Sequence, residues 1–177
     1  IFCAKTHFKL KKHLENILTI IIPRHVNRIK NIYKELSKMN LQVTLSSKIE
    51  NYNLNTDVIL VDSYGEVSKF YHISKSVFLG KSLINSIKND SGQNPIEAAR
   101  LGCKIFHGPN VSNFSEIYDF LKSLNFAKQV ESPEELSRFL LEEFNNESSD
   151  IDEMKKKIEV YGHEILNNVI REIKSFV

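Results

Sequence analysis

Short apolar runs alternate along the chain with longer stretches in which apolar residues recur every three or four positions. The short runs, rich in Ile, Val and Phe, predict buried strands, and the longer periodic stretches predict amphipathic helices. The expected strands are 17–22, 42–45, 58–61, 76–79, 104–107 and 127–130. The expected helices are 26–38, 66–72, 95–101, 115–124, 133–144 and 151–176. Strands that alternate with helices in this way favour an α/β fold with a parallel sheet covered by helices.

The polar stretch NNESSD, residues 145–150, interrupts this pattern before the last helix and predicts a short linker. The helix before it starts at Ser132-Pro133, where an N-cap residue, a proline at N1 and two acids form a strong start signal. A chain of 177 residues is long enough for one domain with a substantial core. We therefore expect one domain over 1–145, and a linker with a C-terminal helix over 146–177.

Composition excludes several classes of function. The formal charge of +2 comes from 24 basic and 22 acidic residues interspersed along the chain, so no nucleic-acid partner is expected. Cys3 and Cys103 lie far apart without metal-binding spacing, and the histidines are equally scattered, so we expect no metal and a reducing compartment. No apolar run is long enough to span a bilayer. The chain opens on Ile1 without a signal-peptide pattern, and we expect its targeting to be determined elsewhere.

Ligands of open α/β sheets bind at the carboxyl ends of the strands, and two loops there carry suitable residues. Pro23-Arg24-His25 follows the first strand, where the Arg24 guanidinium suits a phosphate or a carboxylate. In DSYGEV, 62–67, Gly65 permits close backbone approach, and the amides of Glu66 and Val67 open a helix. Taken alone, each loop is explained as well by an ordinary exposed turn.

A third loop, SGQNPIEAARLG at 91–102, opens a helix with a proline at N1. If Asn94 is the N-cap, Glu97 falls at N3, where a capping box places its carboxylate. A functional interpretation competes. Gly92 permits close approach, the first-turn amides favour an anion, and the Glu97 carboxylate can accept two ribose hydroxyl hydrogen bonds. The residues themselves leave both interpretations open.

Five motifs in this order resemble the carboxyl-terminal half of bacterial 3-deoxy-D-manno-octulosonic acid (Kdo) transferases, enzymes of lipopolysaccharide synthesis. They are IIIPRH (20–25), DSYGEV (62–67), FLGKSLI (78–84), SGQNPIEAARLG (91–102) and GPNVSNFSEI (108–117). Each motif is weak alone, but five in order with compatible spacings are specific. The resemblance covers nearly the whole chain.

The resemblance implies a GT-B glycosyltransferase, in which two Rossmann-like domains face each other and the second binds the nucleotide-sugar donor. This chain looks like that second domain, with CMP-Kdo as donor and a lipid A precursor as acceptor at the cytoplasmic face of the bacterial inner membrane. The family's catalytic base and membrane anchor belong to the amino-terminal half. The resemblance therefore implies a soluble fragment without catalytic residues, cofactor or metal, inactive by itself. Residues 146–177 would pack on the domain or reach toward the other half.

Matched residue by residue, the resemblance implies CMP contacts in three segments of this chain. These are Pro23 and Arg24, then Gly65, Glu66 and Val67, then Asn94, Pro95, Ile96 and Glu97. Glu97 would bind the ribose hydroxyls, the Asn94 helix start would lie near the phosphate, and the middle segment would read the cytosine through its backbone. A donor-sugar loop would involve Gly80, Ser82 and Gly92.

The chain departs from the family pattern at several positions. Lys81 replaces the second glycine of V-G-G-S-L, Gln93 stands where histidine is usual, and the surroundings of Thr6-His7 lack a full T-H-x-G-E-E motif. Two alternatives also remain. One is the donor domain of another GT-B enzyme that uses a UDP-sugar. The other is a non-catalytic nucleotide-binding module on the same scaffold.

Overall fold

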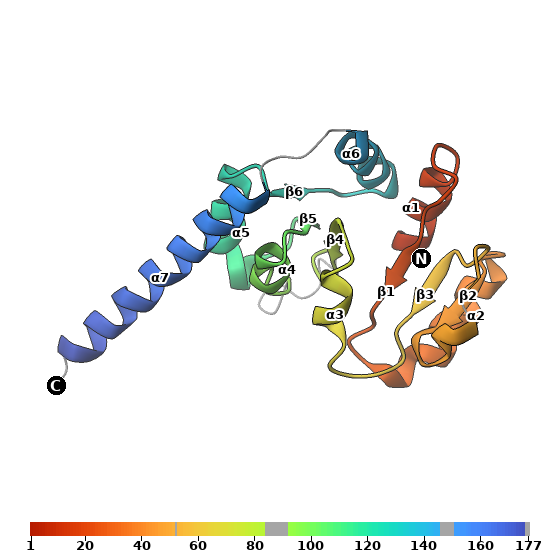
Figure 1. The fold of residues 1–177 in the computed structure, drawn as a ribbon, viewed down its shortest axis with the longest axis horizontal. Coiled ribbons are helices and arrows are strands. Elements are labelled where there is room, and N and C mark those ends of the chain that lie inside the picture. Colours follow the sequence, from red (N-terminus) through yellow and green to blue (C-terminus); the bar gives the residue numbers. More distant parts are fainter. Residues whose placement is uncertain (52, 84–91, 146–150, 176–177) are drawn as a thin grey trace. The chain divides into compact units, whose positions relative to one another are not determined.

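The computed structural model describes residues 1–51, 53–83, 92–145 and 151–175, and these residues divide between two compact units (Figure 1). Unit 1 comprises residues 1–70 and 130–145, and unit 2 comprises the described residues of 71–129 and 146–177. Each unit contains one three-stranded parallel sheet with helices packed around it. The chain therefore passes from unit 1 to unit 2, back to unit 1, and again to unit 2.

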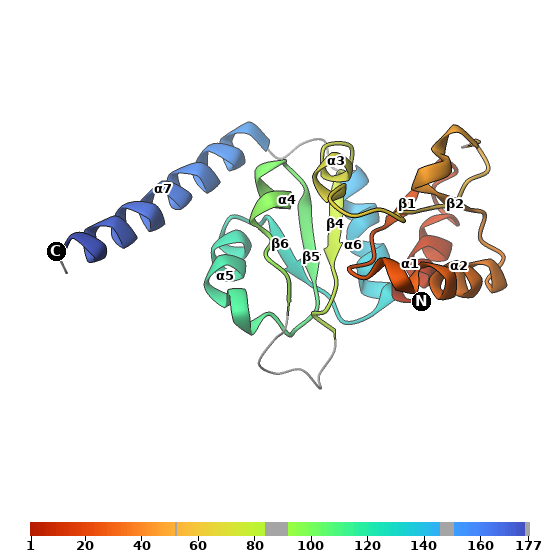
Figure 2. The same ribbon diagram turned by 90° about the horizontal axis from the view of Figure 1, so that it is seen from below.

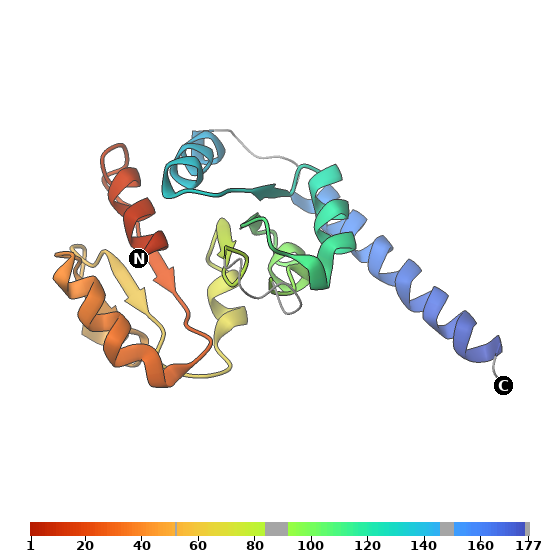
Figure 3. The ribbon, with the colours of Figure 1, turned by 180° about the vertical axis from the view of Figure 1, so that it is seen from behind.

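Unit 1 is built around a parallel sheet with the strand order β1-β3-β2. Its strands are β1 (Thr19–Ile21), β2 (Val43–Leu45) and β3 (Val58–Leu60). Its helices are α1 (Phe2–Leu10), α2 (Ile29–Lys38) and α6 (Pro133–Asn145), with 3-10 turns at Val26–Arg28 and Ser46–Asn51. Helix α3 (Val67–Tyr71) ends where unit 2 begins. The central strand β3 is buried throughout. Helix α1 packs against α6, and Figure 3 shows these two helices side by side.

Unit 2 repeats this arrangement with the strand order β4-β5-β6. Its strands are β4 (Ser76–Leu79), β5 (Lys104–His107) and β6 (Ala127–Gln129), and its helices are α4 (Ile96–Arg100), α5 (Ser115–Ser123) and α7 (Ile151–Ser175). Strand β5 is buried along its whole length. Helix α7 packs on α4, buries Ile158 in the core and stacks Tyr161 on Phe120 at 3.9 Å, and its later turns extend away from α4 and α5 (Figure 2).

The pattern of apolar positions predicted every strand and helix of the alternating series. The ends differ by at most two residues when the 3-10 turn Val26–Arg28 is counted with α2. Helix α1 was not predicted, because Thr6 and His7 on its buried face are polar and hide the apolar periodicity. The predicted boundary between 1–145 and 146–177 stays a prediction, and the expected linker residues 146–150 lie outside the described residues.

A buried carboxylate joins the elements of unit 1 just before β3. Asp57, 5% exposed, accepts hydrogen bonds from the Gln42 amide at 2.8 Å and from the Lys11 ammonium, and its Oδ1 lies 3.3 Å from His7 Nε2. His7 Nδ1 is in turn 3.0 Å from the Thr19 hydroxyl. Burial raises the pKa of Asp57, but these donors together hold the pKa below its ordinary value. Asp57 therefore remains ionised at neutral pH and ties α1 to the amino ends of the strands.

Candidate functional site

The first two predicted loops lie together in unit 1, because they follow β1 and β3, which are neighbouring parallel strands. Pro23 is half-buried, whereas Arg24 is exposed and has no carboxylate partner among the described residues. The amide of Val26 donates to the Tyr64 hydroxyl at 3.4 Å, so the two loops are in contact. The structure thus brings the loop that contains Arg24 into contact with the loop that contains 65–67, at the carboxyl ends of β1 and β3.

The DSYGEV loop adopts the conformation that its glycine predicts. Gly65 has a φ of +78°, which only glycine adopts without strain. The side chain of Glu66 is engaged locally: a hydrogen bond from Ser63 and then the Lys69 ammonium, 3.2 Å away, lower the pKa of Glu66. Because this carboxylate is already paired, a ligand here would be met mainly by the backbone at the start of α3.

Asp62 anchors this loop, a role that the sequence pattern did not reveal. Its carboxylate accepts hydrogen bonds from the Ser46 hydroxyl at 2.8 Å, the Ser47 amide at 2.9 Å and the Ser47 hydroxyl at 2.6 Å. Burial raises the pKa of Asp62, but these hydrogen bonds outweigh it and the pKa is lowered. Asp62 therefore joins the ends of β2 and β3. The sequence did contain a signal for this role: a serine pair follows β2, and an aspartate follows β3.

The third loop belongs to unit 2, and its hydrogen bonds show how far Asn94 and Glu97 form a capping box. Helix α4 begins at Ile96 with Pro95 as its bordering residue, and Asn94 caps this start from one position earlier, because its Oδ1 accepts a hydrogen bond from the Ile96 amide at 3.0 Å. Pro95 is buried with helical dihedral angles. The Glu97 side chain is exposed and has no hydrogen bond or ion pair among the described residues. The reciprocal half of a capping box is thus not formed, and the Glu97 carboxylate is free to meet a ligand.

Ser82 and Gly108 clamp together the loops that follow β4 and β5. The Ser82 hydroxyl donates to the Leu79 carbonyl at 2.6 Å and accepts from the Gly108 amide at 2.8 Å. Ser82 is fully buried, and a Cβ on Gly108 would lie only 2.4 Å from the Ser82 carbonyl oxygen. A contact between Ser82 and the donor sugar stays a prediction. In the ligand-free chain the Ser82 hydroxyl already makes hydrogen bonds to Leu79 and Gly108.

Gly92 of the predicted donor-sugar loop and Lys81, which lies between the predicted Gly80 and Ser82, are both left-handed, and the Gly92 amide donates to the Lys81 carbonyl at 3.5 Å. Gly92 has a φ of +82°, and a Cβ there would lie 3.1 Å from Val111 Cα. Lys81 has a φ of +65°, although a left-handed conformation costs an L-residue roughly 1–2 kcal/mol. This conformation explains why glycine suits position 81 in the family pattern. Gly80 is half-buried, with open space where a Cβ would be.

His107, the last residue of β5, was treated from sequence as one of several scattered histidines. It is fully buried, and its Nδ1 lies 2.6 Å from the Gly108 carbonyl oxygen. Because a carbonyl only accepts, Nδ1 carries the proton and Nε2 bears a lone pair. That Nε2 is buried without a hydrogen-bond partner among the described residues. The His107 ring packs at 4.4 Å, tilted by 53°, against the ring of Tyr118 from α5.

We expect the two buried histidines to make the chain less stable in mild acid. Burial lowers the pKa of His7, against the opposing effect of Asp57, and burial also lowers the pKa of His107. Below about pH 6.5 the unfolded chain therefore binds more protons than the folded chain, and stability falls as pH drops through this window. Each unit of pKa depression contributes up to about 1.4 kcal/mol.

Urea denaturation at pH 8 and pH 5.5 measures this effect. The substitution His163→Gln, at an exposed position of α7, is the matched control and should leave the difference between the two pH values unchanged. His107→Phe should reduce the difference. An equal free energy of unfolding at both pH values would contradict the prediction.

Two further features bear on the class of site. Among residues 1–51, 53–83, 92–145 and 151–175, no group of three or more His, Cys, Asp or Glu side chains is arranged to hold a metal ion. Within the same part of the chain, no helix is long and apolar enough to cross a membrane.

Comparison with known proteins finds several relatives of one kind. The chain is 30% identical over 162 residues, 92% of its length, to a 3-deoxy-D-manno-octulosonic acid transferase of Haemophilus influenzae. It is 33% identical over 131 residues, 74% of its length, to the enzyme of the same name from Rickettsia bellii. The alignments cover 36% and 30% of these proteins, so the chain spans about a third of the length of the curated relatives it matches. No protein-family profile matches the chain.

Among solved structures, the chain is similar to the C-terminal CMP-Kdo binding domain of WaaA from Acinetobacter baumannii. The TM-score is 0.69, with 92% of this chain and 83% of that chain covered. At 23% identity, this likeness shows a shared fold. It confirms the α/β, Rossmann-like arrangement of parallel strands and surrounding helices that the sequence predicted.

Proposed function

Because this chain is a homologue of bacterial 3-deoxy-D-manno-octulosonic acid (Kdo) transferases, we propose that it is the donor-binding domain of such an enzyme. Its ligand would be CMP-Kdo, bound through the CMP moiety. The acceptor would be a lipid A precursor, and the complete enzyme would act at the cytoplasmic face of the bacterial inner membrane. Nucleotide preference distinguishes the UDP-sugar alternative, whereas a non-catalytic module would bind a nucleotide without being part of a transferase.

The exposed Glu97 carboxylate is the observation that carries this proposal. It lies in the first turn of α4, where Asn94 Oδ1 already accepts a hydrogen bond from the Ile96 amide, and it has no hydrogen bond or ion pair among the described residues. A carboxylate that was needed only to complete the cap would reach back to the Asn94 amide. A free carboxylate at this place suits a pair of ribose hydroxyls, because both of its oxygens accept hydrogen bonds.

The other predicted contacts are proposed segment by segment. We assign the CMP phosphate to the Asn94-Pro95-Ile96 turn, and we assign phosphate neutralisation also to Arg24, exposed and without a carboxylate partner in the described chain. The backbone of 65–67 would read the cytosine, which fits a loop whose Glu66 side chain is already paired. The sugar would lie toward the loops that contain Gly80 and Gly92.

The reaction is proposed only for the complete enzyme. An acceptor hydroxyl, deprotonated by a base outside this chain, would attack the anomeric carbon of the donor. The bond from that carbon to the CMP phosphate oxygen would break, and CMP would leave with the electron pair. Arg24 and backbone amides would stabilise the charge on the departing phosphate. The isolated chain is expected to transfer no sugar, and turnover by the purified chain would overturn that part.

Calorimetric titration of the purified chain with CMP, UMP and UDP tests the donor assignment. CMP should bind more tightly than UMP, because the two differ only in the base edge that the 65–67 backbone would read. Tighter binding of UDP than CMP would favour a UDP-sugar donor. Weak binding of all three nucleotides without discrimination would contradict a CMP site.

A further inference from the structure

Tyr118 is a fully buried tyrosine of α5 whose hydroxyl reaches the turn that precedes α4. Its Oη donates a hydrogen bond to the Gln93 carbonyl at 2.9 Å, and the rest of the side chain packs in the core of unit 2. Burial raises the pKa of Tyr118 well above its ordinary value, so the hydroxyl remains a donor at physiological pH. Gln93 directly precedes Asn94, which caps the helix that bears Glu97.

The polar tip of Tyr118 needs an explanation, because its surroundings favour phenylalanine. Apart from His107, most of the neighbouring core residues are apolar, and burying a hydroxyl is unfavourable unless it is hydrogen-bonded. Here the hydroxyl is satisfied by a backbone carbonyl rather than by a side chain. The contact is therefore indifferent to the side chain at position 93, where this sequence has glutamine and the family pattern has histidine.

The ring of Tyr118 is itself held in place from β5. The His107 ring packs against it at 4.4 Å, and His107 is fixed through Nδ1 to the Gly108 carbonyl. The turn is also held at its other end, where the left-handed Gly92 packs against Val111. A chain of contacts thus runs from the carboxyl end of β5 through Tyr118 to the backbone in front of Asn94.

We propose that Tyr118 is a positioning residue of the nucleotide site: its hydroxyl fixes the Gln93–Asn94 backbone, and so sets where the Asn94 turn and Glu97 meet the ligand. This inference rests on the proposed CMP site. Tyr118 does not touch the nucleotide and acts through the turn alone. Without the hydroxyl the turn has more conformational freedom, and ordering it on binding reduces affinity.

Tyr118→Phe tests this role, because it removes one oxygen and keeps the ring against His107. Tyr161→Phe is the matched control, since it removes a tyrosine hydroxyl from the same unit and keeps its stacking on Phe120. In the ligand-free chain, amide hydrogen exchange should accelerate in a peptide that spans 92–101 in Tyr118→Phe and remain unchanged in Tyr161→Phe. CMP affinity should fall roughly 5- to 10-fold in Tyr118→Phe only, the size expected for one lost hydrogen bond.

The two readouts separate the possible failures. Absence of CMP binding by the wild-type chain would overturn the proposed function, whatever the exchange shows. Unchanged exchange in Tyr118→Phe would overturn the positioning role, and so would accelerated exchange with unchanged CMP affinity. If the Tyr118 hydroxyl had a purely structural role, its removal would change amide hydrogen exchange throughout unit 2. Acceleration confined to 92–101 therefore supports the role of Tyr118 in positioning the turn.

Discussion

Replacement of Glu97 by alanine should weaken CMP binding about 10- to 100-fold, the loss expected when hydrogen bonds to a charged group are removed. The physical reason is that the Glu97 carboxylate is exposed, has no hydrogen bond or ion pair among the described residues, and lies in the first turn of α4 next to the Asn94 turn. The same substitution should change the free energy of unfolding by no more than about 0.5 kcal/mol, as for other exposed positions. Calorimetry and urea denaturation measure the two quantities.

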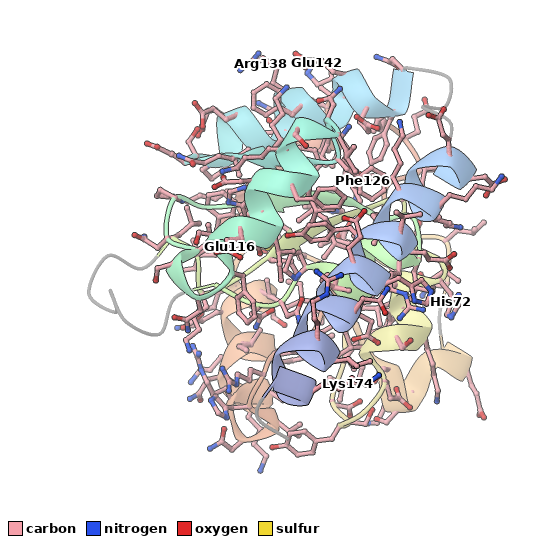
Figure 4. All side chains as sticks on the ribbon, turned by 90° about the vertical axis from the view of Figure 1, so that its left-hand side faces the viewer. His72, Glu116, Phe126, Arg138, Glu142 and Lys174 are labelled. Atoms are coloured by element: carbon pink, nitrogen blue, oxygen red, sulfur yellow. The ribbon has the colours of Figure 1, made fainter. Side chains whose placement is uncertain are left out.

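Two control variants sharpen this test. Glu116→Ala removes an exposed acid from the first turn of α5 (Figure 4) and should leave CMP affinity unchanged. Asn94→Ala removes the cap and should destabilise the chain by about 1 kcal/mol. If Glu97→Ala instead behaved like a cap mutant, with lower stability and unchanged CMP affinity, the ribose assignment would be wrong.

Replacement of Asp57 by asparagine should destabilise the chain by about 2–3 kcal/mol at pH 7. Breaking a buried ion pair commonly costs more than this, but the Lys11 side chain is 48% exposed and can be hydrated when its partner is lost. His7 and the Gln42 amide would then face a neutral amide in place of a carboxylate. The midpoint of urea denaturation should fall accordingly.

Asp119→Asn is the matched control for this charge removal. Asp119 is 73% exposed and pairs with Lys122 at 3.5 Å on the surface of α5, so its loss should change stability by less than about 1 kcal/mol. An equal loss of stability in both variants would show that the Asp57 network contributes no more than a surface ion pair.

The alternating pattern predicted most of the fold because the signals that end strands and helices are local. The Pro23 and Gly65 loops, and the helix start at Pro133, are encoded by neighbouring residues, so the observed ends differ little from those expected. The contacts that stabilise each unit internally are not local. His7 meets Asp57 across 50 positions, and no period in the sequence records that pairing.

The candidate site was predictable in outline and less so in detail. The capping box at Asn94 and Glu97 was expected as one of two alternatives, and the structure contains only its Asn94 half. The roles of Ser82 and Tyr118 depend on partners 26 and 25 positions away, Gly108 and Gln93, which come close only after the parallel strands have paired. Assignment of the CMP contacts themselves stays a prediction.

The packing of α1 on α6 also sets an order of events during synthesis. Unit 1 is discontinuous: α1 is made well before its partner α6, and the strands of unit 2 are made between them. At a ribosomal rate of about 5–20 residues per second, α6 is synthesised on the order of 10 s after α1, and until then α1 lacks this packing partner. During that interval the part of α1 that α6 covers is exposed, whereas Ala4 can already pack against Leu36, Leu41 and Val58, so a nascent-chain chaperone would be expected to shield only the α6-facing side of α1.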